Sequence, residues 1–385
     1  MIIKNVKIVT LNEVIDNGYI EIKEGLISNI VAGEYTGCEE TIDGLGKIAM
    51  PGFIDVHTHG SCGIDFMDAM EEDYKVIETA FYEEGITSFL ATTLTSDIES
   101  MKRVSTVVKN VIDDIPALVG IHLEGPYINK VYKGAQNETF IREPSVDELN
   151  ELIKASGANI RLITMAPELK GSIEFIKEAV KNNITISAGH SNATFADVEK
   201  AIEAGLTNVT HTHNAMSKHD HKNPGIVTAA FYFDELYTEC ICDAIHVHPN
   251  TLKTFYKIVG PERFMIVTDA LLAKHSTVDK FQLFNLDCTY RDGAFYLVEA
   301  GNLAGSALYM NQGLRNVKNI CGASLVELAR ISSYNQAKSL HFEDRGELKV
   351  GKLADIVLVN DEFEILNVYK LGREVFRKAN NFEGV

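Results

Sequence analysis

The segment PGFIDVHTHG, residues 51–60, ends a short apolar run with two histidines that are one residue apart. Side chains alternate between the two faces of a β-strand, so His57 and His59 point in the same direction. Two neutral imidazoles on one face can share a divalent cation, because histidine is the commonest metal ligand near neutral pH. A pair of strand-end histidines with a structural role is the alternative, and only the rest of the chain can decide between the two.

Beyond this segment, apolar runs bounded by turn residues alternate with segments of helical periodicity. The runs are GFIDVH, TSFLATTL, ALVGIHLEG, NIRLITMAPE, TISAGHS, NVTHTHNAM, YTECICDAIH and FMIVTDA. Such an alternation is typical of a parallel sheet, and eight runs predict an α/β fold of the (β/α)₈ TIM-barrel type. An open doubly wound sheet is the competing architecture, but the first turn lacks the glycine-rich phosphate-binding sequence that it would need.

The two ends of the chain differ from this middle part. Residues 1–50 and 345–385 consist of short strand-like runs that are broken by glycine and aspartate. We therefore expect one small β-sandwich domain built from both termini, and a barrel over residues 51–344.

The composition limits the classes of partner. The chain has 385 residues and a formal net charge of −18, which argues against nucleic acid and anionic membranes as partners. The N-terminus has no signal-peptide pattern, and no apolar run is long enough to span a membrane. Six scattered cysteines show no disulfide framework, which favours a cytoplasmic protein.

Potential metal ligands end five of the eight predicted strands. Because the carboxyl ends of barrel strands converge on one mouth, side chains far apart in the sequence are expected to meet there. In strand order these residues are His57 with His59, then Glu124, His190, His211 and Asp269. The set predicts a metal site at the mouth of the barrel.

The ligand types restrict the metal and suggest a reaction. Imidazole together with carboxylate suits zinc, which we favour, or iron, manganese or cobalt. Such a site activates water, and Asp269 is then the natural general base that passes a proton to the leaving group. A ligand role without acid–base work is the alternative for Asp269. Glu124 can bridge two ions or bind one, so one or two ions per chain are expected.

Six motifs together resemble the amidohydrolase superfamily and, within it, the N-acetylglucosamine-6-phosphate deacetylases. The motifs are PGFIDVHTHG, HLEGPYIN, AGHSNAT, VTHTHNAMS, VTDA and GNLAGSAL, and the closing GELKVGKLADIVLVN is similar to the return of that family into its β-sandwich. The resemblance spans nearly the whole chain. It implies metal-dependent hydrolysis of the acetamide of an amino sugar phosphate, in a homodimer with phosphate contacts near the subunit interface.

The resemblance also implies roles for individual residues. Glu124, His190 and His211 match the principal metal ligands, and His57 with His59 matches a second metal position. Asp269 matches the catalytic acid and base. The implied substrate-binding residues are Ala135, Gln136, Asn214, Ala215, Lys222, His246, Leu303, Ala304 and Gly305.

Two positions depart from the family pattern. Lys222 replaces an arginine that grips the phosphate, and a lysine lacks the bidentate fork of a guanidinium. Gln136 replaces a histidine that contacts the sugar in some members, and glutamine cannot carry a proton. The departures leave N-acetylgalactosamine-6-phosphate open as the alternative substrate.

Two further alternatives are another amidohydrolase and a barrel without activity. Members that act on a cyclic amide usually carry a carbamylated lysine on the fourth strand, and NIRLITMAPE has no lysine. An enzyme for a cyclic amide, a urea or a dipeptide is thus the less favoured interpretation. A non-catalytic scaffold would typically have lost ligands, whereas every ligand position is filled here.

Four other histidines lie in or near these motifs without an assigned role. His122 shares the strand face of Glu124, so we expect it to support or pack against the site rather than bind metal. His213 repeats the spacing of His57 and His59 but falls outside the family motif. His219 and His221 lie with Lys222 in one loop, which we interpret as a cationic lip for a phosphate; a solvated polar loop is the alternative.

Overall fold

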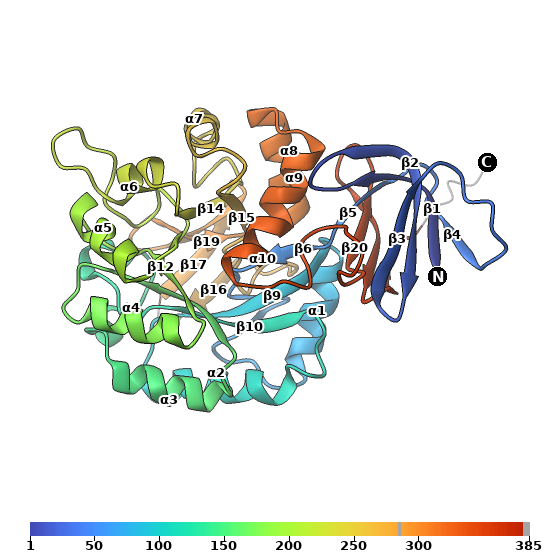
Figure 1. Ribbon diagram of the computed structural model, residues 1–385. Helices are drawn as coiled ribbons and strands as arrows, with labels where there is room; N and C mark the ends of the chain where they lie inside the picture. The colour runs from blue at the N-terminus through green and yellow to red at the C-terminus, as the bar shows by residue number, and fades with distance from the viewer. Residues whose placement is uncertain (284–285, 380–385) are drawn as a thin grey trace.

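The computed structural model describes residues 1–283 and 286–379, and its largest part is a barrel of eight parallel strands (Figure 1). All eight apolar runs that the sequence indicates form these strands. In sheet order they are β6 (Phe53–Asp55), β9 (Ile86–Thr93), β10 (Leu118–Glu124), β11 (Ile160–Met165), β12 (Thr185–Ala188), β13 (Asn208–Val209), β14 (Tyr237–Ile241) and β15 (Phe264–Val267).

Helices cover the outside of the barrel, one after each strand (Figure 1). In chain order they are α1 (Asp73–Tyr82), α2 (Ile98–Val111), α3 (Val146–Ser156), α4 (Ser172–Lys181), α5 (Phe195–Ala204), α6 (Ile226–Tyr232), α7 (Pro249–Val259) and α8 (Met310–Cys321). Helix α2 illustrates why they pack there, because it buries Met101, Val104 and Val108 at helical spacing. The side chain of Asp97 caps its first turn by accepting a hydrogen bond from Ser100 N.

Short helical segments complete the barrel. Two 3₁₀ turns, η1 (Lys130–Tyr132) and η2 (Glu138–Phe140), lie in the long connection after β10. Helix α9 (Leu325–Ala329), the π-helical turn η3 (Arg330–Tyr334) and helix α10 (Asn335–Ser339) follow α8. Within residues 1–283 and 286–379, none of the helices has the length and apolar character that crossing a membrane needs.

The first and last barrel strands meet only beyond their ends, at the mouth. The backbone N–H of Asp269 donates to the carbonyl of His57, and that of His59 donates to the carbonyl of Ala270, both at 2.8 Å. An isolated parallel bridge between Thr58 and Ala270 completes the closure. This seam places His57 and His59 beside Asp269, although about 210 residues separate them in the chain.

A small antiparallel sheet follows the last barrel strand, and the sequence did not predict it. It consists of β16 (Lys280–Leu283), β17 (Leu286–Arg291), β18 (Ala294–Leu297) and β19 (Leu303–Ser306). Ser306 N donates to the carbonyl of Asp269 at 2.7 Å, so β19 lies directly against the end of the eighth strand. A two-stranded hairpin, β7 (Gly60–Ser61) with β8 (Ile64–Asp65), follows His59.

Both termini enter one mixed sheet of eight strands beside the barrel (Figure 1). The strands are β1 (Ile2–Val9), β2 (Val14–Lys23), β3 (Leu26–Ala32), β4 (Thr41–Asp43), β5 (Ile48–Pro51), β20 (Ile356–Val359), β21 (Ile365–Lys370) and β22 (Arg373–Arg377). The predicted union of the two termini is confirmed. The pairing of β20 with β5 joins the C-terminal strands to the N-terminal ones, and Ile8, Ile20 and Leu358 share one buried cluster.

Candidate metal centre

Glu124 lies at the centre of the predicted site because it is the last residue of β10. Alternate residues of that strand share a face, so His122 and Glu124 both point into the barrel. The Glu124 carboxylate is nearly fully buried, and its Oε1 atom lies 3.0 Å from His190 Nε2 and 3.2 Å from His211 Nε2. The two imidazole nitrogens are themselves 3.1 Å apart. We call Glu124, His190 and His211 the Glu124 triangle.

A second set of ligand atoms adjoins the first. Asp269 Oδ1 lies 3.2 Å from His59 Nε2 and 3.5 Å from His57 Nε2. We call His57, His59 and Asp269 the Asp269 triangle. Glu124 connects the two triangles, because its Oε1 is 3.3 Å from His57 Nε2 and its Oε2 is 3.4 Å from His59 Nε2. The structure therefore brings together all six residues that the sequence predicts as ligands.

The distances within both triangles fit divalent metal ions. Nitrogen and oxygen ligands at about 2.0–2.1 Å from a tetrahedral zinc ion lie about 3.3 Å from one another. His57 Nε2 is buried and has no hydrogen-bond partner among the described residues, although two carboxylates face it. Two imidazole nitrogens and a carboxylate oxygen that converge on one point need a cation between them. The residues present thus fit one ion in each triangle.

Without a metal ion, the carboxylates and histidines shift one another's pKa. Burial disfavours the charged form of His57, but Asp269 and Glu124 raise its pKa well above the ordinary value. Burial opposes the charged form of His59 too, yet the same two carboxylates raise its pKa to about 9. Burial would raise the pKa of Glu124, but His57 and His190 hold it well below the usual range. The pKa of Asp269 is lowered by His57 and His59 in the same way.

Three ligand residues have a backbone conformation that side chains other than glycine rarely adopt. The φ angles are +48° at His190, +30° at His211 and +48° at Asp269. Each such residue costs about 1–3 kcal/mol and persists only where the surroundings enforce it, and such strain clusters at functional sites. All three follow the end of a strand, where the chain turns sharply and directs the side chain across the mouth.

Gln136 holds the shared carboxylate in place. Its side-chain Nε2 donates to Glu124 Oε2 at 2.5 Å, and its Oε1 accepts from Thr95 N at 2.7 Å. The amide is therefore fixed on both sides and orients Glu124 from the loop that follows β10. This contact is an additional role for a residue that the sequence associates only with substrate.

A cavity of about 330 Å³ opens above the two triangles. The sequence-predicted residues that line it are His59, Glu124, Ala135, Gln136, His190, His211, Asn214, Ala215, His246, Asp269, Leu303, Ala304 and Gly305. His57 is fully buried beneath the cavity. Lys222 is exposed and does not line the cavity, because its loop turns outward where Asp220 Oδ1 accepts from Lys222 N and Asn223 N.

His246 is held at the cavity by a carboxylate. Asp243 Oδ2 lies 2.6 Å from His246 Nδ1, and Asp243 Oδ1 accepts from the backbone N–H of Ile245 and of His246. No lysine or arginine lines the cavity in the part of the chain that the structure describes. Among the described residues that line the cavity outside the two triangles, His246 is thus the one whose side chain can carry a positive charge for an anionic substrate group.

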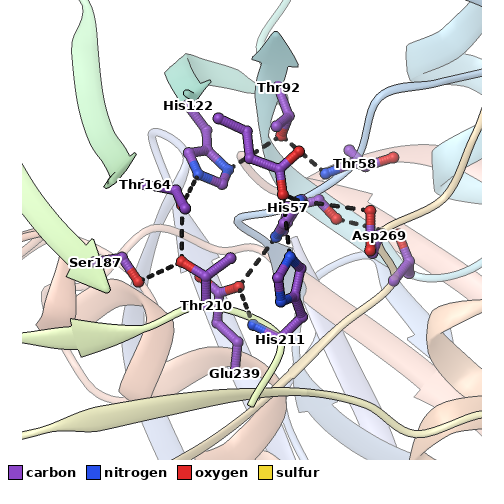
Figure 2. A network of polar contacts seen from close by, with 12 residues as sticks. His57, Thr58, Thr92, His122, Thr164, Ser187, Thr210, His211, Glu239 and Asp269 are labelled. Atoms are coloured by element: carbon purple, nitrogen blue, oxygen red, sulfur yellow. Dashed lines mark hydrogen bonds and ion pairs between the residues drawn. The ribbon is translucent and has the colours of Figure 1, made fainter. Parts of the chain in front are cut away.

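A network of buried polar contacts adjoins the two triangles (Figure 2). The sequence did not predict most of these contacts. His57 Nδ1 lies 3.0 Å from Oε2 of Glu239, a fully buried residue of β14. Asp55 ties the first strand to the last, because it accepts from His57 N and from the hydroxyl of Thr268. Burial raises the pKa of Asp55 to about 6. Glu239 belongs to no recognised motif. The one sequence signal for it is a carboxylate within an otherwise uncharged strand.

Of His122, His213, His219 and His221, only the first lies next to the metal ligands, and the other three lie outside the cavity. His122 lies under the site, where Nε2 is 2.8 Å from Thr164 Oγ1 and burial holds its pKa well below the ordinary value (Figure 2). His213 packs against Phe255 outside the cavity, and burial lowers its pKa to about 4. His219 and His221 are exposed in the loop of Lys222 and do not line the cavity.

Comparisons with known proteins agree with this geometry. Residues 48–375 match the model of the amidohydrolase family. The chain is 35% identical to an N-acetylglucosamine-6-phosphate deacetylase of Bacillus subtilis, over 95% of this chain and 94% of that protein. It is 30% identical to an N-acetylgalactosamine-6-phosphate deacetylase of Shewanella, with 98% and 96% covered.

A solved structure shares the whole architecture. The crystal structure of the N-acetylglucosamine-6-phosphate deacetylase of Thermotoga maritima superposes with a TM-score of 0.91 at 35% identity, covering 98% of this chain and 100% of that one. The barrel and the mixed sheet of both termini are therefore a shared framework.

Proposed function

Because the chain belongs to the amidohydrolase family, we propose that it hydrolyses the acetamide of N-acetylglucosamine-6-phosphate to acetate and glucosamine-6-phosphate. The observation that carries the proposal is the pair of ligand triangles joined by Glu124 beneath a cavity. The similarity to deacetylases over nearly the full chain supports the substrate class.

The residues of both triangles would hold the metal ions that this chemistry needs. Glu124, His190 and His211 form the first position, and His57, His59 and Asp269 form the second. A divalent ion bound there supplies Lewis-acid activation of the amide carbonyl and of water. Zinc fits the mixture of imidazole and carboxylate, as do iron, manganese and cobalt.

Asp269 is placed to move the proton during hydrolysis. Its carboxylate lines the cavity and, as a ligand beside a divalent ion, would be ionised and able to accept a proton from the attacking water. The same oxygen can then deliver that proton to the amide nitrogen as the C–N bond breaks, so the amine leaves neutral. The hydrogen bonds of the seam fix the backbone of Asp269 on both sides, which keeps the carboxylate in position.

The remaining cavity residues bind the sugar and its phosphate. Asn214 and the segment 303–305 line the walls, and His246 with Asp243 supplies the polar group for the phosphate end. Lys222 is not positioned to contribute in the single chain. A homodimer, which the family resemblance implies, would allow further phosphate contacts, and sedimentation analysis tests that state.

The experiment that tests the function compares two substrates. Acetate release is measured from N-acetylglucosamine-6-phosphate and from its galactosamine epimer, each with and without a chelator. We expect chelator-sensitive release that favours the glucosamine substrate. Absence of release from both substrates with metal present would contradict the deacetylase function.

N-Acetylgalactosamine-6-phosphate is the second candidate substrate. Gln136 is the observation that favours it, because this residue departs from the histidine pattern at a position that lines the cavity. The similarity to the N-acetylgalactosamine-6-phosphate deacetylase of Shewanella points the same way. Faster acetate release from the galactosamine epimer would select this candidate.

We also propose where the protein works and how its chain is divided. All six cysteines lie in the described part of the chain and are free, which supports a reducing cytoplasm. A barrel over residues 51–344 between terminal segments 1–50 and 345–385 is supported by the two separate sheets. Limited proteolysis near these boundaries tests the division.

A further inference from the structure

No lysine or arginine among the described residues pairs with the buried carboxylate of Glu239, whose ion-pair partner there is His57. Glu239 lies inside the barrel on β14 with no exposed surface. Its Oε2 atom lies 3.0 Å from His57 Nδ1 and accepts a hydrogen bond from the backbone N–H of His211 at 3.2 Å. Its Oε1 atom has no hydrogen-bond partner among residues 1–283 and 286–379. Both of its contacts are thus residues of the two ligand triangles (Figure 2).

The contact with Glu239 determines which nitrogen of His57 can bind an ion. A carboxylate oxygen that already accepts a backbone N–H is an acceptor, so His57 must donate from Nδ1. The hydrogen then stays on Nδ1, and the lone pair available for a metal ion is on Nε2. This is the nitrogen that faces Asp269 Oδ1 and Glu124 Oε1. A carboxylate behind a ligating imidazole also makes that imidazole a stronger ligand.

Glu239 supports a ligand side chain of the Asp269 triangle but none of the Glu124 triangle. It touches a side-chain nitrogen in the Asp269 triangle, but only a backbone N–H in the Glu124 triangle. His190, in the Glu124 triangle, instead has its Nδ1 atom 2.8 Å from the carbonyl of Tyr132. Removing the charge of Glu239 should therefore lower the metal affinity of the Asp269 triangle and leave that of the Glu124 triangle unchanged.

We propose that Glu239 is the positioning residue that makes His57 a metal ligand through Nε2, and that it thereby sets the affinity of the second metal position. The proposal rests on the metal-dependent function above. The test of the proposal measures metal binding, which does not depend on the identity of the substrate. A purely structural role for Glu239 would instead affect both metal positions alike, through the stability of the barrel.

The test is a zinc titration of metal-free protein against a competing chromophoric chelator. We expect two equivalents for the wild-type protein. In Glu239→Gln, the second equivalent should bind roughly 10–100-fold more weakly, the range typical of lost support behind a metal ligand, and the first should be unchanged. Equal weakening of both equivalents, no weakening, or a single equivalent in the wild type would overturn the proposal.

Thr238→Val is the matched control. Thr238 is the neighbour of Glu239 on β14, is equally buried, and donates its hydroxyl to the carbonyl of Arg263 away from the triangles. This variant should bind both equivalents as the wild type does. Selective loss of the second equivalent in Thr238→Val would overturn the assignment to Glu239.

A second measurement observes the wild-type protein and needs no Glu239 variant. Nitrogen NMR of ¹⁵N-histidine-labelled, zinc-loaded protein reports which ring nitrogen carries hydrogen, and the signal that disappears in His57→Gln is assigned to His57. We expect hydrogen on Nδ1 of His57 and metal on Nε2. The opposite arrangement would overturn the proposal, whatever the acetate assay shows.

Discussion

The two ligand triangles share Glu124 but are supported in different ways. In the Glu124 triangle, His190 is held by a neutral carbonyl of the loop that contains η1, and that loop also lines the cavity. In the Asp269 triangle, His57 is held by a buried carboxylate on a barrel strand. The first position is therefore tied through His190 to a loop at the cavity, whereas the second is tied through His57 to the barrel itself.

The largest effect should come from the carboxylate that both triangles share. In Glu124→Ala, both positions lose a ligand, so metal content should collapse and turnover should fall by more than the ~10²–10⁴-fold of a lost proton shuttle. Elemental analysis and acetate release measure the two effects. Glu151→Ala, on the exposed face of α3, is the control. Full metal content in Glu124→Ala would refute the shared role.

The second largest effect is expected for Asp269, where a substitution can distinguish metal ligation from proton transfer. Asp269→Asn keeps the shape of the side chain but removes the base, so turnover should drop by about 10²–10⁴-fold. The Glu124 triangle is untouched and should keep its metal ion, which elemental analysis measures. If this variant turns over near the normal rate, Asp269 is not the base.

A smaller effect is expected at His246, which lines the cavity but belongs to neither triangle. His246→Gln should raise KM for the phosphorylated sugar about tenfold, equivalent to about 1.4 kcal/mol of lost binding, with kcat little changed. Lys222→Ala should change KM less than His246→Gln does, because Lys222 is exposed and outside the cavity of its own chain. Steady-state kinetics with phosphorylated and unphosphorylated sugars compare the variants. A larger effect of Lys222→Ala would place the phosphate near that loop.

The smallest effect is a dependence of stability on pH in metal-free protein. The pKa of His59 is raised to about 9, so its ion pairs stabilise the fold fully below pH ~6.5 and lose their contribution as the pH rises through about 9. The melting temperature should fall by several degrees between pH 6.5 and 9.5 because this contribution is lost over that range. Scanning calorimetry measures it.

Metal-loaded protein provides the contrast for that measurement. A bound ion takes the lone pair of His59, so the same pH range should leave its melting temperature nearly constant. An equal fall with and without metal would show that His59 is not the group responsible.

The sequence could predict the barrel and the ligand set because both depend on local patterns. Each strand is an apolar run that ends in a turn, and a barrel necessarily brings strand ends together. The proximity of His57 to Asp269 follows from that closure alone, without any knowledge of the residues between them.

Other features have no local signature. Glu239 lies in a strand-like run, and its partner His57 is 182 positions away, so the reason for its burial appears only in three dimensions. The strands between residues 280 and 306 are short and partly exposed, which weakens the alternation that would reveal them. The motif position of Lys222 suggested a phosphate contact, but a turn capped by Asp220 directs the loop outward.

The seam between the first and last strands has a consequence for how the chain matures. His57 and His59 emerge from the ribosome about 210 residues before Asp269, so the second metal position cannot form until the barrel is nearly complete. Contacts of such long sequence separation are slow to form during folding. The ability to bind a second ion therefore reports that the barrel has closed, and a chain truncated before Asp269 is expected to lack it.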